Sequence, residues 1–159
     1  MTTPLRTGIY PGSFKPFTKG HHDVVSRALK VLDKVVILLC VNPRKTAEQQ
    51  TEQHRQQIEE LYKNEPRVQV VCWNGLVYQF AQQTAGAVLV RGVRTASDFE
   101  YEQAMAAYHL QHHGLDTLLL TSRPALSYIS SSLVRELEAF GEDASEFLPP
   151  APSNHPPKA

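Results

Sequence analysis

Residues 12–21 of the chain run Gly12-Ser13-Phe14-Lys15-Pro16-Phe17-Thr18-Lys19-Gly20-His21. This stretch follows a short apolar run and precedes a helical pattern. A strand that turns through glycine into a helix presents unpaired backbone N–H groups and the positive end of a helix dipole, and both attract phosphate. The stretch has no Gly-Lys-Ser/Thr of the common phosphate loop, and instead places the imidazole of His21 on the first helical turn. It predicts a phosphate-binding turn, while a plain glycine turn with a helix-capping Thr is the alternative interpretation.

Around this turn, short apolar runs alternate with helical patterns along the chain. The runs predicted to be strands are 6–10, 34–41, 67–72, 87–90 and 117–120. The segments predicted to be helices are 20–32, 51–63, 76–84, 97–112 and 131–140. Nearly continuous apolar strands that alternate with helices predict an α/β fold with a doubly wound, five-stranded parallel sheet. Such a sheet binds ligands at the carboxyl ends of its strands.

Length and composition exclude several classes of protein. The chain has 159 residues, with 16 Lys and Arg against 16 Asp and Glu, so no overall charge draws it to nucleic acid or to a membrane surface. The apolar runs have the length of strands, and the N-terminus has no long apolar segment, so we expect no membrane span, no signal peptide and a cytoplasmic location. Residues 1–148 are expected to form one domain, and the Pro-rich segment 149–159 a flexible tail.

The two cysteines, Cys40 and Cys72, lie inside apolar runs. They are expected to be buried, reduced thiols. No Cys/His cluster has the spacing of zinc ligands, so no residues are predicted to ligate a metal.

Polar motifs follow four of the five predicted strands. They are the turn at 12–21, Asn42-Pro43-Arg44-Lys45, Arg91-Gly92-Val93-Arg94, and Ser127-Tyr128-Ile129-Ser130-Ser131-Ser132. Lys45, Arg91 and Arg94 are each consistent with a solvated surface cation, but together they indicate a polyphosphate site, because a guanidinium group can bind phosphate oxygens in a bidentate manner. Gly92 is expected to allow a tight turn that directs both arginines to one ligand.

Two helix starts carry alternative interpretations. Ser130-Ser131-Ser132 caps the last predicted helix, and its hydroxyl and N–H groups also indicate a second anion site. The run Asp98-Phe99-Glu100-Tyr101-Glu102 is either an acidic first turn that complements the helix dipole or a segment whose Glu102 faces a ribose or adenine. No paired nucleophile and base is present in the sequence. A site with many cations and few nucleophiles favours phosphoryl or nucleotidyl transfer.

With these residues identified, the chain resembles the bacterial phosphopantetheine adenylyltransferases of the (His/Thr)-x-Gly-His nucleotidyltransferase superfamily. The resemblance covers residues 6–150. It depends on Tyr-Pro-Gly-Ser-Phe-x-Pro-Phe-Thr-x-Gly-His at 10–21, Arg-Gly-Val-Arg at 91–94, Asp-Phe-Glu-Tyr-Glu at 98–102 and Ile-Ser-Ser-Ser-Leu-Val-Arg-Glu at 129–136. The first motif is superfamily-wide, and the other three in this order are specific to this family.

The resemblance implies a Rossmann-like nucleotidyltransferase fold and a reversible reaction. The phosphate of 4′-phosphopantetheine attacks the α-phosphorus of ATP in line, without a covalent enzyme intermediate, and gives dephospho-coenzyme A and pyrophosphate with the assistance of Mg²⁺. It also implies a homohexamer and inhibition by coenzyme A.

The same resemblance assigns roles to individual residues. His21 would stabilise the transition state. Residues that would contact ATP are Ser13, Phe14, His21, Gly92, Val93, Arg94, Glu102, Leu126, Ser127, Tyr128, Ile129, Ser130, Ser131 and Ser132. Residues that would contact 4′-phosphopantetheine are Ser13, Lys45, Val77 and Arg91.

One residue departs from the family pattern: Lys15 stands where the family has Asp in Phe-Asp-Pro. Lys15 either points to solvent, adds a phosphate contact that disturbs metal placement, or disables the chemistry. Retained activity is favoured because every other motif position is present. The alternatives are a related nucleotidyltransferase with another phosphorylated acceptor, such as nicotinamide mononucleotide or a glycerol phosphate, and a non-catalytic nucleotide-binding module. The polar, Gln-rich segment 46–55 is expected to be a surface loop or a mobile flap.

Overall fold

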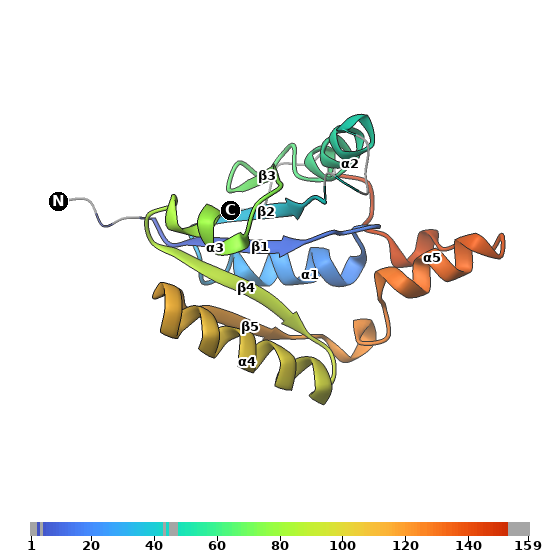
Figure 1. Cartoon of the computed structure of the whole chain (residues 1–159). Helices are drawn as coiled ribbons and strands as arrows, with labels where there is room; N and C mark the ends of the chain where they lie inside the picture. The colour runs from blue at the N-terminus through green and yellow to red at the C-terminus, as the bar shows by residue number, and fades with distance from the viewer. Residues whose placement is uncertain (1–2, 4, 43, 45–47, 153–159) are drawn as a thin grey trace.

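The computed structural model describes residues 3, 5–42, 44 and 48–152 and consists of a sheet flanked by helices (Figure 1). Its elements in chain order are β1 (Thr7–Gly12), α1 (Lys19–Ala28), β2 (Lys34–Cys40), α2 (Glu48–Leu61), β3 (Val68–Trp73), α3 (Val77–Gln82), β4 (Ala87–Val93), α4 (Ala96–His113), β5 (Thr117–Thr121), the short 3₁₀ helix η1 (Pro124–Leu126), α5 (Ser131–Ala139) and the 3₁₀ helix η2 (Ser145–Phe147). Each predicted strand and helix is present, with ends that coincide with the predicted ones or differ by at most four residues.

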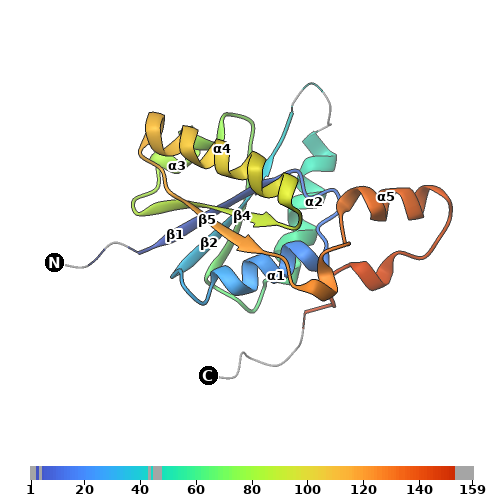
Figure 2. The same ribbon diagram turned by 90° about the horizontal axis from the view of Figure 1, so that it is seen from below.

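The sheet has five strands in the order β3-β2-β1-β4-β5, and all of its described pairs are parallel. The predicted doubly wound α/β fold is therefore confirmed. In β2, Val35, Ile37 and Leu39 pack with residues of α1 and α2, whereas Val36 and Leu38 pack with residues of α3. Burial on both faces explains why this strand has no polar alternation. Figure 2 shows α1 and α4 on opposite sides of the sheet.

A crevice forms where β1 and β4 lie side by side. The chain leaves β1 toward α1 on one face of the sheet and leaves β4 toward α4 on the other face (Figure 2). The two connections diverge at the carboxyl ends of adjacent strands, which is the usual ligand site of an open parallel sheet. The helix α5 lies at this same end of the sheet (Figure 1).

The segment predicted to be a polar loop is mostly helical. Helix α2 begins at Glu48, three residues before the start of the predicted helix 51–63, while residues 46 and 47 lie outside the described ones. Glu and Gln are strong helix formers, and Arg55 pairs along the helix with Glu52 at 2.7 Å and Glu59 at 2.9 Å. The loop interpretation of residues 48–55 is therefore wrong, and the mobile flap stays a prediction.

Two further sequence expectations can be compared with the structure. Cys40 and Cys72 are free thiols as predicted, but both are half-buried rather than fully buried. Within the residues described, no helix combines the length and apolar character needed to cross a bilayer. Of the expected tail, residues 153–159 lie outside the described part of the chain.

Candidate active site

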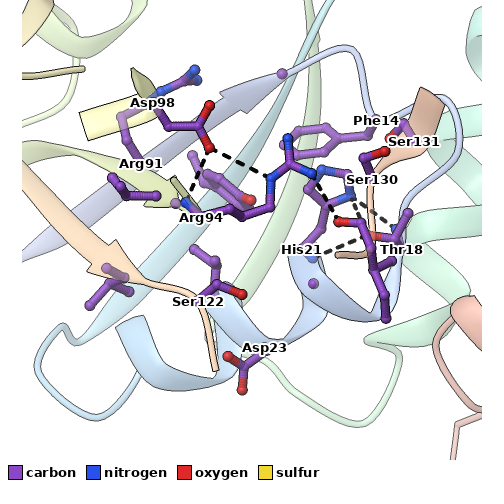
Figure 3. Close-up of a pocket in the computed structure, with 18 of the residues that line it drawn as sticks. Phe14, Thr18, His21, Asp23, Arg91, Arg94, Asp98, Ser122, Ser130 and Ser131 are labelled. Carbon is purple, nitrogen blue, oxygen red and sulfur yellow. Dashed lines mark hydrogen bonds and ion pairs between the residues drawn. The ribbon is translucent and has the colours of Figure 1, made fainter. Parts of the chain in front are cut away.

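A cavity of about 480 Å³ lies at the carboxyl ends of β1 and β4 (Figure 3). We call it the main cavity. The predicted site residues that line it are Ser13, Phe14, His21, Arg91, Gly92, Val93, Arg94, Glu102, Ile129, Ser130, Ser131 and Ser132. Three of the four polar segments that follow strands therefore meet at one place.

The remaining predicted site residues lie elsewhere. Leu126, Ser127 and Tyr128 are not among the residues that line the main cavity: the ring of Tyr128 packs edge-on against Phe147, and Ser127 bonds the carbonyl oxygen of Pro124. Lys45 lies outside the described residues, so its predicted position is not tested.

The loop after β1 turns its aromatic side chain inward. Phe14 has a left-handed backbone (φ 49°), and its buried ring packs against Tyr10 at 5.1 Å and His21 at 5.0 Å between centroids. A Cβ atom on Gly12 would lie 2.9 Å from the Phe14 ring, so only glycine fits there. The glycine of this turn thus makes room for the aromatic ring that supports the imidazole.

His21 is held by the cap of its own helix. The N–H of Thr18 donates to Nδ1 of His21 at 2.9 Å, and the side chain of Thr18 in turn accepts from the backbone N–H of His21, which completes a reciprocal capping box. Because Nδ1 accepts a backbone N–H, the proton of the neutral ring must be on Nε2. The predicted helix-capping Thr is confirmed, and the cap also fixes the tautomer of the imidazole.

His21 is neutral at physiological pH. Burial, together with the positive charges of Arg94 and Arg91, lowers the pKa of His21 to about 4. A neutral Nε2–H is a hydrogen-bond donor that carries no charge of its own. It is therefore suited to donate to an anionic phosphate oxygen rather than to act as an acid.

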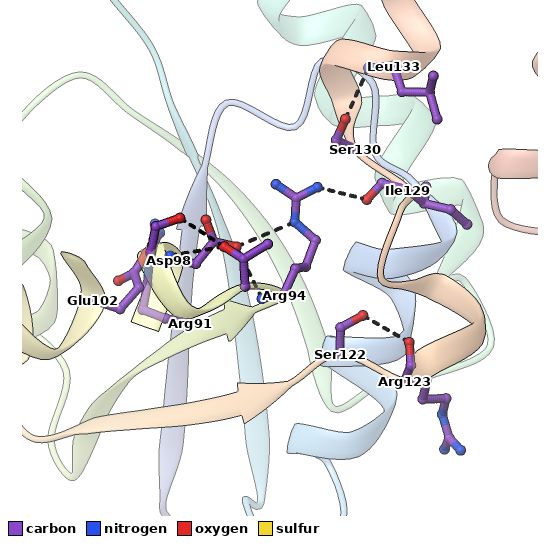
Figure 4. Close-up of polar contacts among 11 residues, drawn as sticks. Arg91, Arg94, Asp98, Glu102, Ser122, Arg123, Ile129, Ser130 and Leu133 are labelled. Atoms are coloured by element: carbon purple, nitrogen blue, oxygen red, sulfur yellow. Dashed lines mark hydrogen bonds and ion pairs between the residues drawn. The ribbon is translucent and has the colours of Figure 1, made fainter. Parts of the chain in front are cut away.

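Arg91 is paired with a buried carboxylate. Its Nε and Nη2 donate to the carboxylate of Glu102 at 2.8–3.0 Å, and its Nη1 donates to the carbonyl oxygen of Pro11 at 2.8 Å (Figure 4). Glu102 is only 7% exposed. Burial alone would lower the pKa of Arg91, but the hydrogen bonds and charge of Glu102 outweigh that effect and raise it. In this structure the carboxylate of Glu102 therefore holds the guanidinium group of Arg91 in place.

Arg94 reaches across the main cavity. Its backbone N–H donates to Asp98 at 3.1 Å, its Nε lies 3.7 Å from the same carboxylate, and its Nη1 donates to the carbonyl oxygen of Ile129 at 3.2 Å (Figures 3 and 4). Its side chain is 41% exposed. Arg94 thus links β4 to the segment before α5 and remains accessible to a ligand.

The expected role of Gly92 is wrong. Gly92 lies inside β4 and makes no tight turn. A Cβ atom there would lie 3.1 Å from Cγ2 of Val24, so glycine allows α1 to pack closely on the strand.

The N-terminus of α5 closes the cavity. Ser130 is the N-cap and accepts from the N–H of Leu133 at 3.0 Å, as the sequence predicts. Ser131 donates to the carbonyl oxygen of Pro16 at 2.8 Å. The end of this helix and the loop after β1 are therefore joined directly, and the helix dipole points into an already cationic cavity.

The carboxylates that line the main cavity are all engaged by arginines. Asp23 pairs with Arg27 and Arg123, and Asp98 and Glu102 pair as described above. Among the described residues no group of three or more His, Cys, Asp or Glu is placed to hold a metal ion. The residues present thus do not fit a resident Mg²⁺, whereas Mg²⁺ commonly reaches such sites on substrate phosphates.

A second cavity of about 230 Å³ shares a wall with the main cavity. Pro11, Gly12, Arg91 and Glu102 line both. Its other lining residues are Cys40, Val77, Leu89, Tyr101, Met105, Ala106, His109 and Thr117. Burial raises the pKa of the Cys40 thiol, which keeps it protonated. Val77 is therefore in the same cavity as Arg91, as the sequence interpretation groups them.

Lys15 does not line the main cavity. It is exposed and lines a third cavity of about 560 Å³ beside α2 and α5, with Arg135 shared between this cavity and the main one. The site roles of Asp23, Asp98 and Arg135 were not predicted. Asp98 and Arg135 lie within the motifs at 98–102 and 129–136, but their spacing in the sequence does not show that their side chains line the main cavity.

Comparison with known proteins agrees with this geometry. The cytidylyltransferase-like family profile matches residues 9–137. Phosphopantetheine adenylyltransferase of Porphyromonas gingivalis is 43% identical over 141 residues, which is 89% of this chain and 92% of that protein. The chain belongs to the phosphopantetheine adenylyltransferase family. Its counterpart in Bacteroides thetaiotaomicron is 41% identical over 91% of this chain and 96% of that protein.

Solved structures share the fold at low identity. A bifunctional NMN adenylyltransferase/ADP ribose pyrophosphatase of Francisella tularensis, complexed with AMP and a Mn ion, superposes with a TM-score of 0.62 at 19% identity. The match covers 96% of this chain and 46% of that one, so this chain spans about half of it. A putative nicotinate-nucleotide adenylyltransferase of Vibrio parahaemolyticus gives 0.61 at 15% identity, covering 91% and 93% of the two chains. These neighbours confirm the Rossmann-like nucleotidyltransferase fold.

Proposed function

We propose that the chain transfers the adenylyl group of ATP reversibly to 4′-phosphopantetheine, giving dephospho-coenzyme A and pyrophosphate. Membership of the phosphopantetheine adenylyltransferase family supports both the reaction and the enzyme class. The observation that carries the assignment of the two substrates is the shared wall of the two cavities.

The two cavities differ in chemistry. The main cavity has the cations, the hydroxyls and two helix N-termini, and it takes the triphosphate and nucleoside of ATP. The smaller cavity is lined by Val77, Met105 and Cys40 and takes the thiol-bearing arm of the acceptor. The acceptor phosphate then lies at the partition, beside Arg91 and close to the α-phosphate.

The reaction is a direct displacement. An anionic oxygen of the acceptor phosphate forms the new P–O bond to the α-phosphorus, and the bond from that phosphorus to the bridging oxygen of pyrophosphate breaks. The nucleophile is already deprotonated, so no general base is needed. His21 donates its Nε2–H to the α-phosphate as charge develops, and Arg94 and the N-terminus of α5 stabilise the polyphosphate.

The residue roles follow from this placement. The walls around ATP are formed by Ser13, Phe14, Gly92, Val93, Glu102, Ile129, Ser130, Ser131 and Ser132. Contacts of Lys45 with the acceptor phosphate and of Leu126–Tyr128 with the nucleotide belong to the same proposal, with Mg²⁺ arriving on ATP. A cytoplasmic location, a homohexamer and binding of coenzyme A complete it.

The experiment is an acceptor panel with the purified chain. With Mg²⁺, ATP and 4′-phosphopantetheine, the enzyme should release pyrophosphate from ATP and form dephospho-coenzyme A, which mass spectrometry detects. With nicotinate or nicotinamide mononucleotide and ATP, or with glycerol phosphate and CTP, it should release no pyrophosphate above background. Pyrophosphate formed only with one of these other acceptors contradicts the proposal, as does tight ATP binding without turnover at any metal concentration.

A further inference from the structure

Side chains of two helices that are distant in sequence, α2 and α5, hydrogen-bond to main-chain carbonyl groups of the loop after β1. Nε2 of His54, on α2, lies 3.3 Å from the carbonyl oxygen of Ser13. Nη1 of Arg135, on α5, donates to the carbonyl oxygen of Lys15, and the hydroxyl of Ser131 donates to that of Pro16. Three carbonyl groups within four residues thus accept hydrogen bonds from side chains outside the loop.

This arrangement matters for phosphate binding. A carbonyl oxygen that faced the main cavity would repel a phosphate, whereas an N–H would attract it. In a trans peptide the C=O and the following N–H point in opposite directions. When His54 holds the carbonyl of Ser13 on the α2 side, the N–H of Phe14 is directed to the other side, where Ser13 and Phe14 line the main cavity.

Arg135 is fixed at both ends of its guanidinium. Besides the carbonyl of Lys15, it contacts the hydroxyl of Ser132 at 3.2 Å through Nη2. Its partner in the loop is a main-chain atom, so the contact does not depend on which side chain stands at position 15. The Lys in place of the family's Asp leaves it intact.

We propose that His54 and Arg135 are positioning residues for adenylyl transfer. His54 acts through the carbonyl of Ser13 and keeps the N–H of Phe14 toward the phosphates. Arg135 acts through the carbonyl of Lys15 and holds the middle of the loop in place, where the next residue, Pro16, has no N–H of its own. This inference rests on the proposed function, because it concerns the same site.

Arg135 also lines the main cavity, so the test must separate positioning from a direct contact with ATP. In Arg135→Ala, kcat should fall about tenfold while KM for ATP changes less than threefold. The loop loses its orientation, whereas the binding of ATP does not depend on the charge of Arg135. Arg135→Gln retains a neutral N–H donor and should stay within about threefold of wild type in kcat. Arg135→Lys should do the same.

The matched control is Arg67→Ala. Arg67 also donates to a main-chain carbonyl, that of Leu29 at 3.2 Å, and also pairs with a neighbouring side chain, Glu65, but it lies outside the main cavity. The Arg67→Ala substitution removes the same charge and the same kind of hydrogen bond as Arg135→Ala. Both steady-state constants should match wild type.

A second readout does not require turnover. Amide hydrogen exchange of residues 14, 15, 17 and 18 should accelerate at least threefold in Arg135→Ala and in His54→Ala, and remain unchanged in Arg67→Ala. His54→Ala should lower kcat by about threefold to fivefold.

The outcomes are distinct. A raised KM for ATP with unchanged kcat, and loss of function in Arg135→Gln but not in Arg135→Lys, would show a direct charge contact and overturn the proposal. Unchanged exchange and unchanged kcat would overturn it as well. If wild type releases no pyrophosphate from ATP in the presence of 4′-phosphopantetheine, the proposed function fails, while the exchange measurement still decides whether these side chains hold the loop.

Discussion

The two walls of the main cavity bind anions by different means. On the β1 wall, which we define as residues 12–21, His21 and Thr18 are neutral, and a capping box fixes their geometry. On the β4 wall, defined as residues 91–102, Arg91 and Arg94 are charged, and carboxylates of the same wall hold them. One wall presents oriented dipoles and the other presents charges.

The difference also separates two arginines that look equivalent in Arg-Gly-Val-Arg. Arg91 is committed to the buried Glu102 and to Pro11, whereas Arg94 has a longer ion pair of 3.7 Å and is more exposed. The two arginines therefore carry the same charge but differ in how available each guanidinium group is to a ligand. Each of the following tests compares the two walls.

The largest effect is expected on the neutral wall. His21→Ala should lower kcat by roughly a hundredfold or more, because one preorganised donor to developing charge contributes about 3–4 kcal/mol. Steady-state kinetics of pyrophosphate release measures it. His22→Ala, on the same helical turn, should stay within about threefold, and a His21→Ala enzyme within a few-fold of wild type would show that the imidazole has no role in the transition state.

The next test concerns the stability of the charged wall. Arg91→Ala leaves Glu102 buried without its partner, which should cost about 2–3 kcal/mol, somewhat less than a fully buried pair because Arg91 is partly exposed. Thermal unfolding should shift down by roughly 5–10 °C. The double variant Arg91→Met/Glu102→Leu should recover most of the loss. A single variant as stable as wild type would show that the pair does not hold the wall.

Arg94 should behave in the opposite way. Arg94→Ala should raise KM for ATP about tenfold, since a charge-assisted hydrogen bond contributes about 1.5–3 kcal/mol. Its melting temperature should stay close to that of wild type, because its ion pair is exposed. If Arg94→Ala instead melts early and binds ATP normally, the roles of the two arginines are reversed.

The walls are coupled through the pKa of His21. Burial and the two arginines keep it at about 4, so the ring should show no NMR titration between pH 5 and pH 9. Acidification favours the unfolded state, in which the histidine takes up a proton near its ordinary pKa of about 6.5, so stability should fall from there toward pH 4. Arg94→Ala should raise the pKa of His21 part of the way, whereas Arg67→Ala should leave it unchanged. A wild-type midpoint near 6.5 would contradict the coupling.

The smallest effect is expected at Lys15. Because Lys15 is exposed and lines the third cavity, Lys15→Asp should change kcat and KM for ATP by less than about threefold, as is usual for a screened surface charge. Lys30→Asp, exposed in the turn that follows α1, is the control. A tenfold change specific to position 15 would place its side chain at the phosphates.

The sequence predicts the scaffold well because burial on both faces leaves a strong signal. The run 34–41 differs from β2 by a single residue for this reason. That the ends of β1 and β4 meet follows from parallel pairing. The partner of Arg91 does not follow, because Glu102 is eleven residues away on a helix packed across the strand, and no periodicity links them. The direction of Lys15 is equally hidden, since it follows a phenylalanine in a left-handed conformation that the residue type rarely adopts.

The capping box of His21 has one more consequence. The same ring nitrogen that closes the first turn of α1 also determines which face of the imidazole is available for chemistry. Acid that adds a proton to Nδ1 breaks the hydrogen bond from the N–H of Thr18, so one half of the capping box is lost and the Nε2–H, although still a donor, is no longer held in its orientation. Loss of turnover and fraying of α1 should therefore share one midpoint, so that this enzyme has no acid form that is correctly folded at its first helix yet idle.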